Sequence, residues 1–340
     1  MHVIPARGHV TTAQPTHLDK INSQIVGLLF GNSRKNFADI AEEVGISKNA
    51  AWSRYLKMKE AGVITGATVQ VNYKKLGYDA VGTVLLDIEN TQMEKLDRYV
   101  KAHVPDAFGP VISTTKYNVR LVVPIKNITD LGKLKEGITK KIPVAEINSS
   151  LWTDIWFTPE NLTQIPVPLT KTSTPETSGN PFHADQTDLS LIGALAEDSR
   201  TSFRALATQM NVSVDTIARR YRRLREQNVI VPRIQIAPSK IGYSATVHSY
   251  LKITAKHNMD AVLKKMLQCP EVFYVMKFRG DLSVGVMFMV KSVEDMLETG
   301  EYIARTEGVK RLETVVSSAS DKWPLPRTYT SVLGNSIIPD

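Results

Sequence analysis

The second half of the sequence repeats the first half, and this duplication limits the possible folds more than any other feature. At an offset of 166 residues, the halves match at Asp19 and Asp185, Arg34 and Arg200, Phe37 and Phe203, Ser47 and Ser213, Arg54 and Arg220, and Tyr55 and Tyr221. After one deletion the offset becomes 165, and Leu76-Gly77-Tyr78 matches Ile241-Gly242-Tyr243. The repeat and the length of 340 residues therefore predict two copies of one folded unit rather than a single domain with one core.

Within each copy, the spacing of apolar residues changes from helical to strand-like, near residue 63 in the first copy. The pattern predicts three helices, the last two at 36–43 and 47–61, with N-caps at Asn36, Ser47, Ser202 and Ser213 across both copies. A strand at 65–71 follows the helices. The next predicted elements are 81–88, 92–102, 107–115, 118–125, 129–140 and 144–153, and in the second copy 245–254, 259–268, 271–279, 282–290, 293–305 and 309–319. Their order is β-α-β-β-α-β, the ferredoxin-like arrangement.

The predicted fold class is α+β, a tandem duplication of a helix-turn-helix domain followed by a ferredoxin-like βαββαβ domain. Five prolines and many Ser and Thr between the copies cannot bury a core and predict an extended linker. The predicted segments are an N-terminal arm at 1–17, helix-turn-helix domains at 18–76 and 185–242, βαββαβ domains at 77–158 and 243–326, the linker at 159–184 and a C-terminal tail at 327–340.

Positive charge is concentrated in the two helical segments. Nine Lys and Arg face five Asp and Glu over 18–76, and nine face six over 185–242, so these segments carry nearly all of the net charge of +8. Such a balance suits a polyanionic partner. The single Cys269 excludes an internal disulfide framework, and no apolar run is long enough to span a membrane. A cytoplasmic protein without a membrane contact is expected.

A short helix, a turn at Gly45 or Asn211 and a second helix begun by a serine have the spacing of a helix-turn-helix, whose second helix enters the DNA major groove. The alternative is a three-helix packing module. The pattern occurs twice and carries the charge, so it favours double-stranded DNA as the partner. No phosphate-binding loop, nucleophile elbow or zinc-ligand spacing is present in the sequence, and no cofactor or metal is predicted.

The two second helices present different outward faces on a helical wheel. In the second copy Ile217, Tyr221 and Leu224 form the buried face. The predicted DNA contacts of that copy are Ser213, Asp215, Thr216, Arg219, Arg220, Arg222 and Arg223, and those of the first copy are Ser47, Lys48, Asn49, Ser53, Arg54 and Lys57. Arg54 and Arg220 lie at the flank of the buried face, where each reaches either its own domain or a phosphate.

The second helix-turn-helix is expected to supply more electrostatic affinity than the first. Six Arg lie between Arg219 and Arg233, against three Lys and Arg in the matching stretch of the first copy. Asn49 is suited to a bidentate contact with adenine, and Lys57 to a phosphate contact. The two helix-turn-helix domains, which we also call the two heads, are therefore predicted to contact DNA with different sets of side chains.

These segments together resemble the Lrp/AsnC family of transcription regulators. The resemblance is carried by LDKINSQIV and DQTDLSLI, by IAEEVGISKNAAWSRYLKMKEAGVI and LATQMNVSVDTIARRYRRLREQNVI, and by NYKKLGY and PSKIGY. It implies winged helix-turn-helix domains, each joined by a strand to a ligand-sensing, oligomer-forming βαββαβ (RAM) domain. Because such domains pair between chains in ordinary members, two units in one chain imply an internal pseudo-dimer, with further oligomers left open.

The resemblance also implies an amino-acid effector site near the loop that joins the middle strands, where a glycine and an aspartate recur. This sequence departs from that pattern in both copies. The first copy lacks both residues, and the second has Ser at the position of the aspartate. The candidate ligand-binding residues are Tyr117, Asn118, Gly280, Asp281 and Ser283.

Two other functions fit parts of the sequence. Siroheme decarboxylases resemble this family, their sheet domains resemble residues 117–121, and His103 or His248 would supply acid or base chemistry. The two histidines do not match each other in the repeat. A chromatin-organising protein would differ from a regulator mainly in lower sequence selectivity. The prediction is a sequence-selective DNA-binding transcription regulator and not an enzyme.

Overall fold

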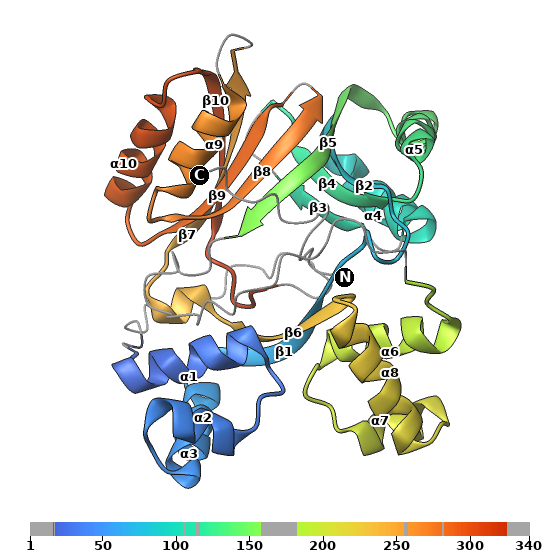
Figure 1. Ribbon diagram of the computed structural model, residues 1–340. Coiled ribbons are helices and arrows are strands. Elements are labelled where there is room, and N and C mark those ends of the chain that lie inside the picture. Colours follow the sequence, from blue (N-terminus) through green and yellow to red (C-terminus); the bar gives the residue numbers. More distant parts are fainter. Residues whose placement is uncertain are drawn as a thin grey trace.

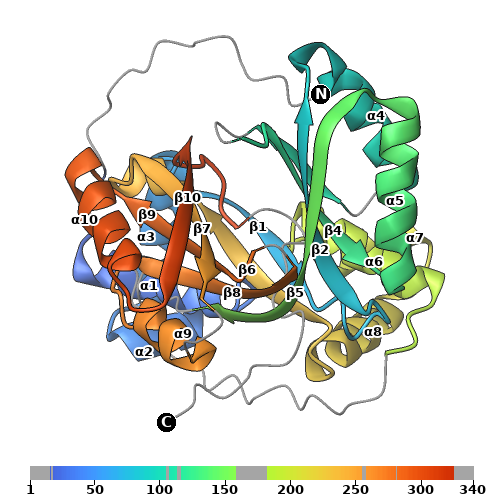
Figure 2. The same cartoon turned by 90° about the horizontal axis from the view of Figure 1, so that it is seen from above.

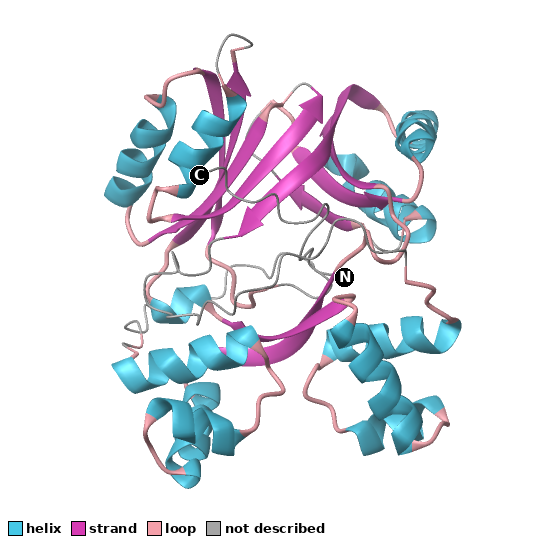
Figure 3. Cartoon of the chain, in the orientation of Figure 1, coloured by secondary structure: helices cyan, strands magenta, loops and turns pink. Residues whose placement is uncertain are grey.

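The computed structural model describes residue 16 and residues 18–104, 107–112, 116–157, 182–254, 258–280 and 282–324. Nearly all of the predicted N-terminal arm, most of the linker, the C-terminal tail and Asp281 lie outside these residues. Figure 3 separates the helices from the strands and shows two groups of helices at one end of the molecule and the sheet at the other. None of the described helices combines the length and the apolar composition needed to cross a membrane.

Each copy begins with three helices, which we call the helical modules. The first module contains α1 (Lys20–Gly31), α2 (Phe37–Val44) and α3 (Lys48–Glu60), and the second contains α6 (Gln186–Glu197), α7 (Phe203–Met210) and α8 (Val214–Glu226). All four predicted N-caps are confirmed, because the side chains of Asn36, Ser47, Ser202 and Ser213 accept backbone N–H groups. Gly45 and Asn211 make the tight turns in the left-handed conformation, which glycine and asparagine tolerate best.

Each copy continues with the expected βαββαβ order. The first contains β2 (Ala80–Ile88), α4 (Met93–His103), β3 (Phe108–Ile112), β4 (Val119–Ile125), α5 (Ile128–Lys141) and β5 (Val144–Phe157). The second contains β7 (Ala245–Ile253), α9 (Met259–Leu267), β8 (Val272–Gly280), β9 (Val284–Val290), α10 (Val293–Ala304) and β10 (Val309–Ser318). The eight strands form one sheet in the order β10-β7-β9-β8-β5-β2-β4-β3. The predicted α+β class is confirmed.

The helical modules exchange places between the copies. The strands that follow them, β1 (Ile64–Val71) and β6 (Ile230–Ile236), pair antiparallel with each other. The core of the first module includes Ile234, Ile236 and Phe273 of the second copy, and the core of the second module includes Val69 and Val71 of the first. Each module therefore packs against strands of the other copy, at the end of the molecule opposite the large sheet (Figure 1). The two copies form one pseudo-symmetric body.

The halves of the large sheet face each other at an angle and are joined along β5 and β8 (Figure 2). A two-fold relation would also pair β10 with β3, but both lie at ends of the described sheet. Where β5 carries Ile155 and Trp156, the matching stretch after β10 carries Ser320 and Asp321, which do not favour a strand. At the position of Val275 in β8, β3 has Pro110. Proline lacks the backbone N–H that would donate to a neighbouring strand. Among the described strands, the seam between β5 and β8 is therefore closed by strand pairing, whereas β10 and β3 do not pair.

Candidate nucleic-acid interface

The two recognition helices, α3 and α8, belong to modules that share one end of the molecule (Figure 1). Each begins at a capped serine, since Ser47 accepts from the N–H of Ala50 and Ser213 from that of Thr216. On α8 the predicted Ile217 and Leu224 are fully buried and Tyr221 is half-buried, and on α3 Ala51 is fully buried. The opposite faces of both helices are therefore the surfaces available to DNA.

On α8, Arg219 and Arg222 are exposed, and neither has a hydrogen bond or an ion pair with another described residue. Asp215 is exposed in the first turn, while Thr216 is half-buried and its hydroxyl lies 2.8 Å from that of Ser213. The two arginines lie three positions apart, so their guanidinium groups extend from one face of the helix. That face is open and positively charged.

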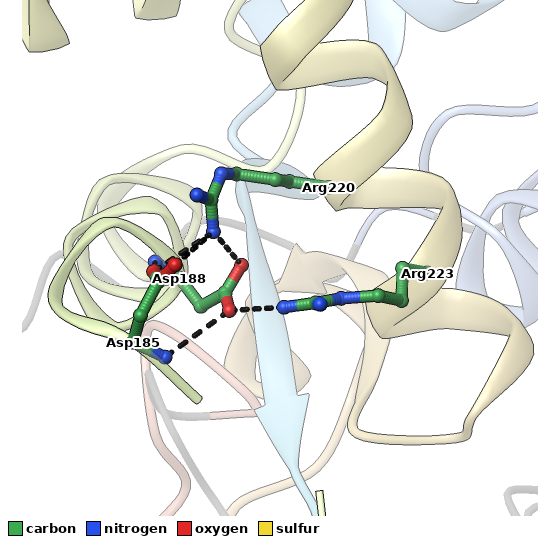
Figure 4. Close-up of polar contacts among 4 residues, drawn as sticks. All are labelled: Asp185, Asp188, Arg220 and Arg223. Carbon is green, nitrogen blue, oxygen red and sulfur yellow. Dashed lines mark hydrogen bonds and ion pairs between the residues drawn. The ribbon is translucent and has the colours of Figure 1, made fainter. Parts of the chain in front are cut away.

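Arg223 is exposed, as the helical wheel predicts, but it also pairs with a carboxylate. Figure 4 shows Arg220 and Arg223 extending from α8 toward two carboxylates at the start of α6. Arg220 donates to Asp185 and to Asp188, each at 2.8 Å, and Arg223 pairs with Asp188 and lies over the ring of Phe182. Asp188 is fully buried, so two arginines compensate its desolvated charge. These two side chains hold α8 against α6.

This ion-pair group shifts the pKa values of Asp185 and Arg220. The backbone N–H of Asp188, followed by the guanidinium of Arg220, lowers the pKa of Asp185 below 3.8. Hydrogen bonds to Asp188 and Asp185 raise the pKa of Arg220. The first module has a smaller version, in which Arg54 donates to Asp19 at 2.6 Å and to Asn22 at 3.0 Å. Of the two possibilities for Arg54 and Arg220, the structure therefore favours attachment to their own domains.

On α3, the predicted contacts Lys48, Asn49, Ser53 and Lys57 are all exposed. Ser53 and Lys57 line a surface hollow of about 300 Å³ beside Arg54 and Asn22. The outward face also carries Trp52, 45% exposed, and Leu56, 38% exposed. Trp52 was not among the predicted contacts, although an aromatic residue on the outward side of a reading helix is a visible signal. Exposed apolar side chains on such a helix are suited to thymine methyl groups.

The charge difference between the two heads is smaller than the sequence count indicates. Arg233, counted with the second head, is half-buried in β6, where it donates to Gln70 Oε1 at 2.5 Å and to the carbonyl oxygen of Phe30 at 2.8 Å. Burial lowers its pKa to about 10. With Arg220 and Arg223 paired to carboxylates, half of the six arginines are engaged by other groups of the protein. The heads differ more in kind of side chain than in charge.

The candidate effector residues of the first copy make contacts within the protein. The Tyr117 hydroxyl donates to Glu146 Oε1 at 2.6 Å, and burial together with this carboxylate raises the pKa of Tyr117. The side chain of Asn118 bonds both the N–H and the carbonyl oxygen of Ile88, which fixes the end of β2. These contacts give both residues a structural role.

The second copy repeats part of this arrangement. The N–H of Ile253 donates to Ser283 Oγ at 3.2 Å, as Ile88 does to Asn118. Gly280 has φ of +141°, and a Cβ at that position would lie 3.0 Å from the carbonyl oxygen of Ser149. Gly280 therefore permits the close approach of β8 to β5. Asp281 lies outside the described residues.

The two histidines of the enzyme hypothesis lie in different surroundings. His103 is exposed at the end of α4, with Nδ1 2.8 Å from the carbonyl oxygen of Tyr99. His248 lies on β7, and burial, with a smaller contribution from the charge of Arg120, lowers its pKa well below 6.5. Since they belong to different copies and different layers, they do not form a paired acid and base.

Both helical modules match family models. Residues 185–225 match the AsnC-type helix-turn-helix domain, and residues 18–65 match a winged helix-turn-helix DNA-binding model. In the structure, the strand after each recognition helix pairs with its counterpart from the other copy. The two family models therefore fall on the two copies found in the sequence.

Two curated relatives each match less than half of this chain. The regulatory protein AsnC of Escherichia coli is 30% identical over 141 residues, which are 39% of this chain and 86% of AsnC. The transcriptional regulator Ptr1 of Methanocaldococcus jannaschii is 29% identical over 151 residues, 44% of this chain and 99% of Ptr1. Each relative thus corresponds in length to about one of the two copies.

A solved structure resembles the chain over nearly its whole length. The siroheme decarboxylase NirDL has a TM-score of 0.59 at 14% identity, and the match covers 91% of this chain and 94% of NirDL. At this identity the likeness extends to the fold alone. It shows that the overall fold of this chain also occurs in another protein.

Proposed function

The chain belongs to the Lrp/AsnC family of transcription regulators, and from this premise we propose that its two unequal recognition helices bind double-stranded DNA together and sequence-selectively. The observation that carries the proposal is the open face of α8, where Arg219 and Arg222 are exposed and are not engaged by described residues. In α3, Asn49, Ser53 and Lys57 occupy the corresponding side of the helix. A cytoplasmic location is part of this proposal.

Each head is assigned a different kind of contact. Arg219 and Arg222 are suited to guanine edges or phosphates, while Asn49 is suited to adenine. Trp52 and Leu56 add apolar surface to the first head. One asymmetric site, or two neighbouring sites of different sequence, is the expected target.

The test measures DNA affinity as a function of salt on a duplex selected in vitro by the full chain. Arg219→Ala with Arg222→Ala should reduce the slope of log affinity against log salt by about 2, since each phosphate contact contributes about 0.9. Lys95→Ala with Lys310→Ala removes two exposed positive charges from the sheet region and should leave the slope unchanged. Equal slopes in both variants, or no binding at low salt, would refute the proposal.

Selectivity separates a regulator from a chromatin-organising protein. A regulator should bind the selected duplex at least about 1,000-fold more tightly than random DNA. Similar affinity for both would favour the organising role. The decarboxylase hypothesis has weaker support, because His103 and His248 do not lie together.

The binding of a small-molecule effector, such as an amino acid, stays a prediction. The candidate residues are Tyr117, Asn118, Gly280, Asp281 and Ser283. An amino acid that binds there should raise the midpoint of thermal unfolding. The shift should be lost in Tyr117→Phe, which removes the hydroxyl that bonds Glu146. If none of the common amino acids shifts the midpoint at millimolar concentration, amino-acid sensing is not supported.

A further inference from the structure

The two helical modules contact each other through the turns that follow α1 and α6. The hydroxyl oxygens of Ser33 and Ser199 lie 2.7 Å apart, and both residues are fully buried. Arg34 donates to the carbonyl oxygens of Ser199 at 2.6 Å and Thr201 at 2.8 Å, and Arg200 donates to the carbonyl oxygen of Ser33. We call Ser33, Arg34, Ser199 and Arg200 the inter-module clamp.

Both arginines of the inter-module clamp also lie over aromatic rings of the opposite module. The Cζ of Arg34 is 4.4 Å from the ring centre of Phe203 and 5.2 Å from that of Tyr221. Arg200 lies 5.4 Å from Phe37 and 5.3 Å from Tyr55. Tyr221 belongs to α8 and Tyr55 to α3, so each arginine touches the recognition helix of the other module.

These contacts are directional, unlike the packing around them. The apolar core of each module includes strands of the opposite copy, and the two cores form separate clusters. The clamp joins the modules to each other by hydrogen bonds and cation–π contacts, which weaken when angles and distances change. Burial lowers the pKa of Arg34, because its charge is removed from water.

We propose that Arg34 and Arg200 are positioning residues that hold α3 and α8 at one separation and angle, so that the chain selects DNA by the spacing of two half-sites. The proposal rests on the DNA-binding function proposed above. Major grooves return to one face of DNA about every 10 base pairs. A fixed pair of helices accepts one spacing, whereas a loosely joined pair accepts several.

The first test varies the spacer of the selected duplex in steps of one base pair. The unchanged chain should lose about tenfold or more in affinity when the spacer grows by half a helical turn, about 5 base pairs. Arg34→Ala with Arg200→Ala should reduce this difference to about threefold or less. This double variant should bind a duplex that contains one half-site with the same affinity as the unchanged chain. Lys35→Ala with Arg204→Ala, two positive charges outside the clamp, should keep the spacing preference.

The second test needs no DNA. Spin labels at Ser53→Cys and Arg219→Cys report the distance between α3 and α8, and the natural Cys269 stays unlabelled because it is buried and its pKa is raised to about 11. The distance distribution should be narrow in the parent chain and broader in the arginine variants. Ser33→Ala with Ser199→Ala provides a milder variant if the arginine variants unfold.

The two tests separate the two proposals. Narrow distances and an unchanged spacing preference in the clamp variants would overturn the inference while leaving DNA binding intact. If the parent chain binds no duplex at low salt, the proposed function fails, and with it the inference. In that case the distance measurement still shows whether the clamp orders the helices.

Discussion

At the scale of single residues, the arginines of α8 divide into two groups that their residue type does not distinguish. Arg219 and Arg222 are exposed, whereas Arg220 and Arg223 pair with carboxylates of α6. The helical period predicts which residues share a face, but it does not indicate which residue of another helix will pair with them. Asp188 lies 35 positions before Arg223 and approaches it only when α6 packs on α8, so the sequence did not indicate that the exposed Arg223 is ion-paired.

Asp188→Asn should destabilise the chain by about 1–3 kcal/mol, because it removes the charge that compensates two arginines. Asn22 holds the equivalent position in the first module, so the substitution gives the second module the residue natural to the first. Chemical unfolding followed by circular dichroism measures the change. Glu298→Gln, an exposed change on α10, should have little effect. Equal stability of the two variants would contradict the role of Asp188.

Acid should weaken the helical modules through Asp19 and Asp185. Their backbone N–H partners and their arginines lower both pKa values below the ordinary 3.8. A lowered pKa in the folded state contributes stability above the ordinary value, and this contribution is lost as the pH falls through the lowered one. Asp19→Asn with Asp185→Asn should therefore flatten the decline of stability below pH 3.8. An unchanged acid unfolding curve would show that these carboxylates are not linked to folding.

At the scale of elements, local signals predicted helix starts well, but they did not predict which strands pair between the copies. Ser47 and Ser213 cap their helices as expected, because a cap depends on residues three positions away. The predicted strand at 144–153 ends too early, since β5 continues to Phe157. The last residues of β5 pair with β8 of the other copy. The sequence around β5 does not indicate that this strand will be its partner.

Gly280→Ala tests the closed seam between β5 and β8. Its positive φ and the 3.0 Å approach to Ser149 predict a loss of stability of about 1–3 kcal/mol. Gly132→Ala, in α5 with open space around its Cβ position, should instead stabilise by about 0.5–1 kcal/mol. Thermal unfolding of both variants measures the contrast. A Gly280→Ala chain as stable as the parent would show that the seam tolerates a side chain there.

At the scale of the whole molecule, the duplication predicted an internal pair, but not that the copies exchange their helical modules. The exchange depends on β1 pairing with β6, which brings Phe273 into the core of the first module and Val69 into that of the second. The apolar pattern indicates that these residues are buried, but it does not indicate in which of the two modules they are buried. The result is one body with two recognition helices at the same end (Figure 1).

The most direct measurement is a hydroxyl-radical footprint of the selected duplex at a known ratio of chain to DNA. One chain per duplex should protect two segments centred on major grooves. Arg219→Ala with Arg222→Ala should weaken protection of one segment, and Asn49→Ala with Lys57→Ala protection of the other. A single protected segment, or two segments that appear only when two chains bind, would contradict the account of one chain with two reading heads.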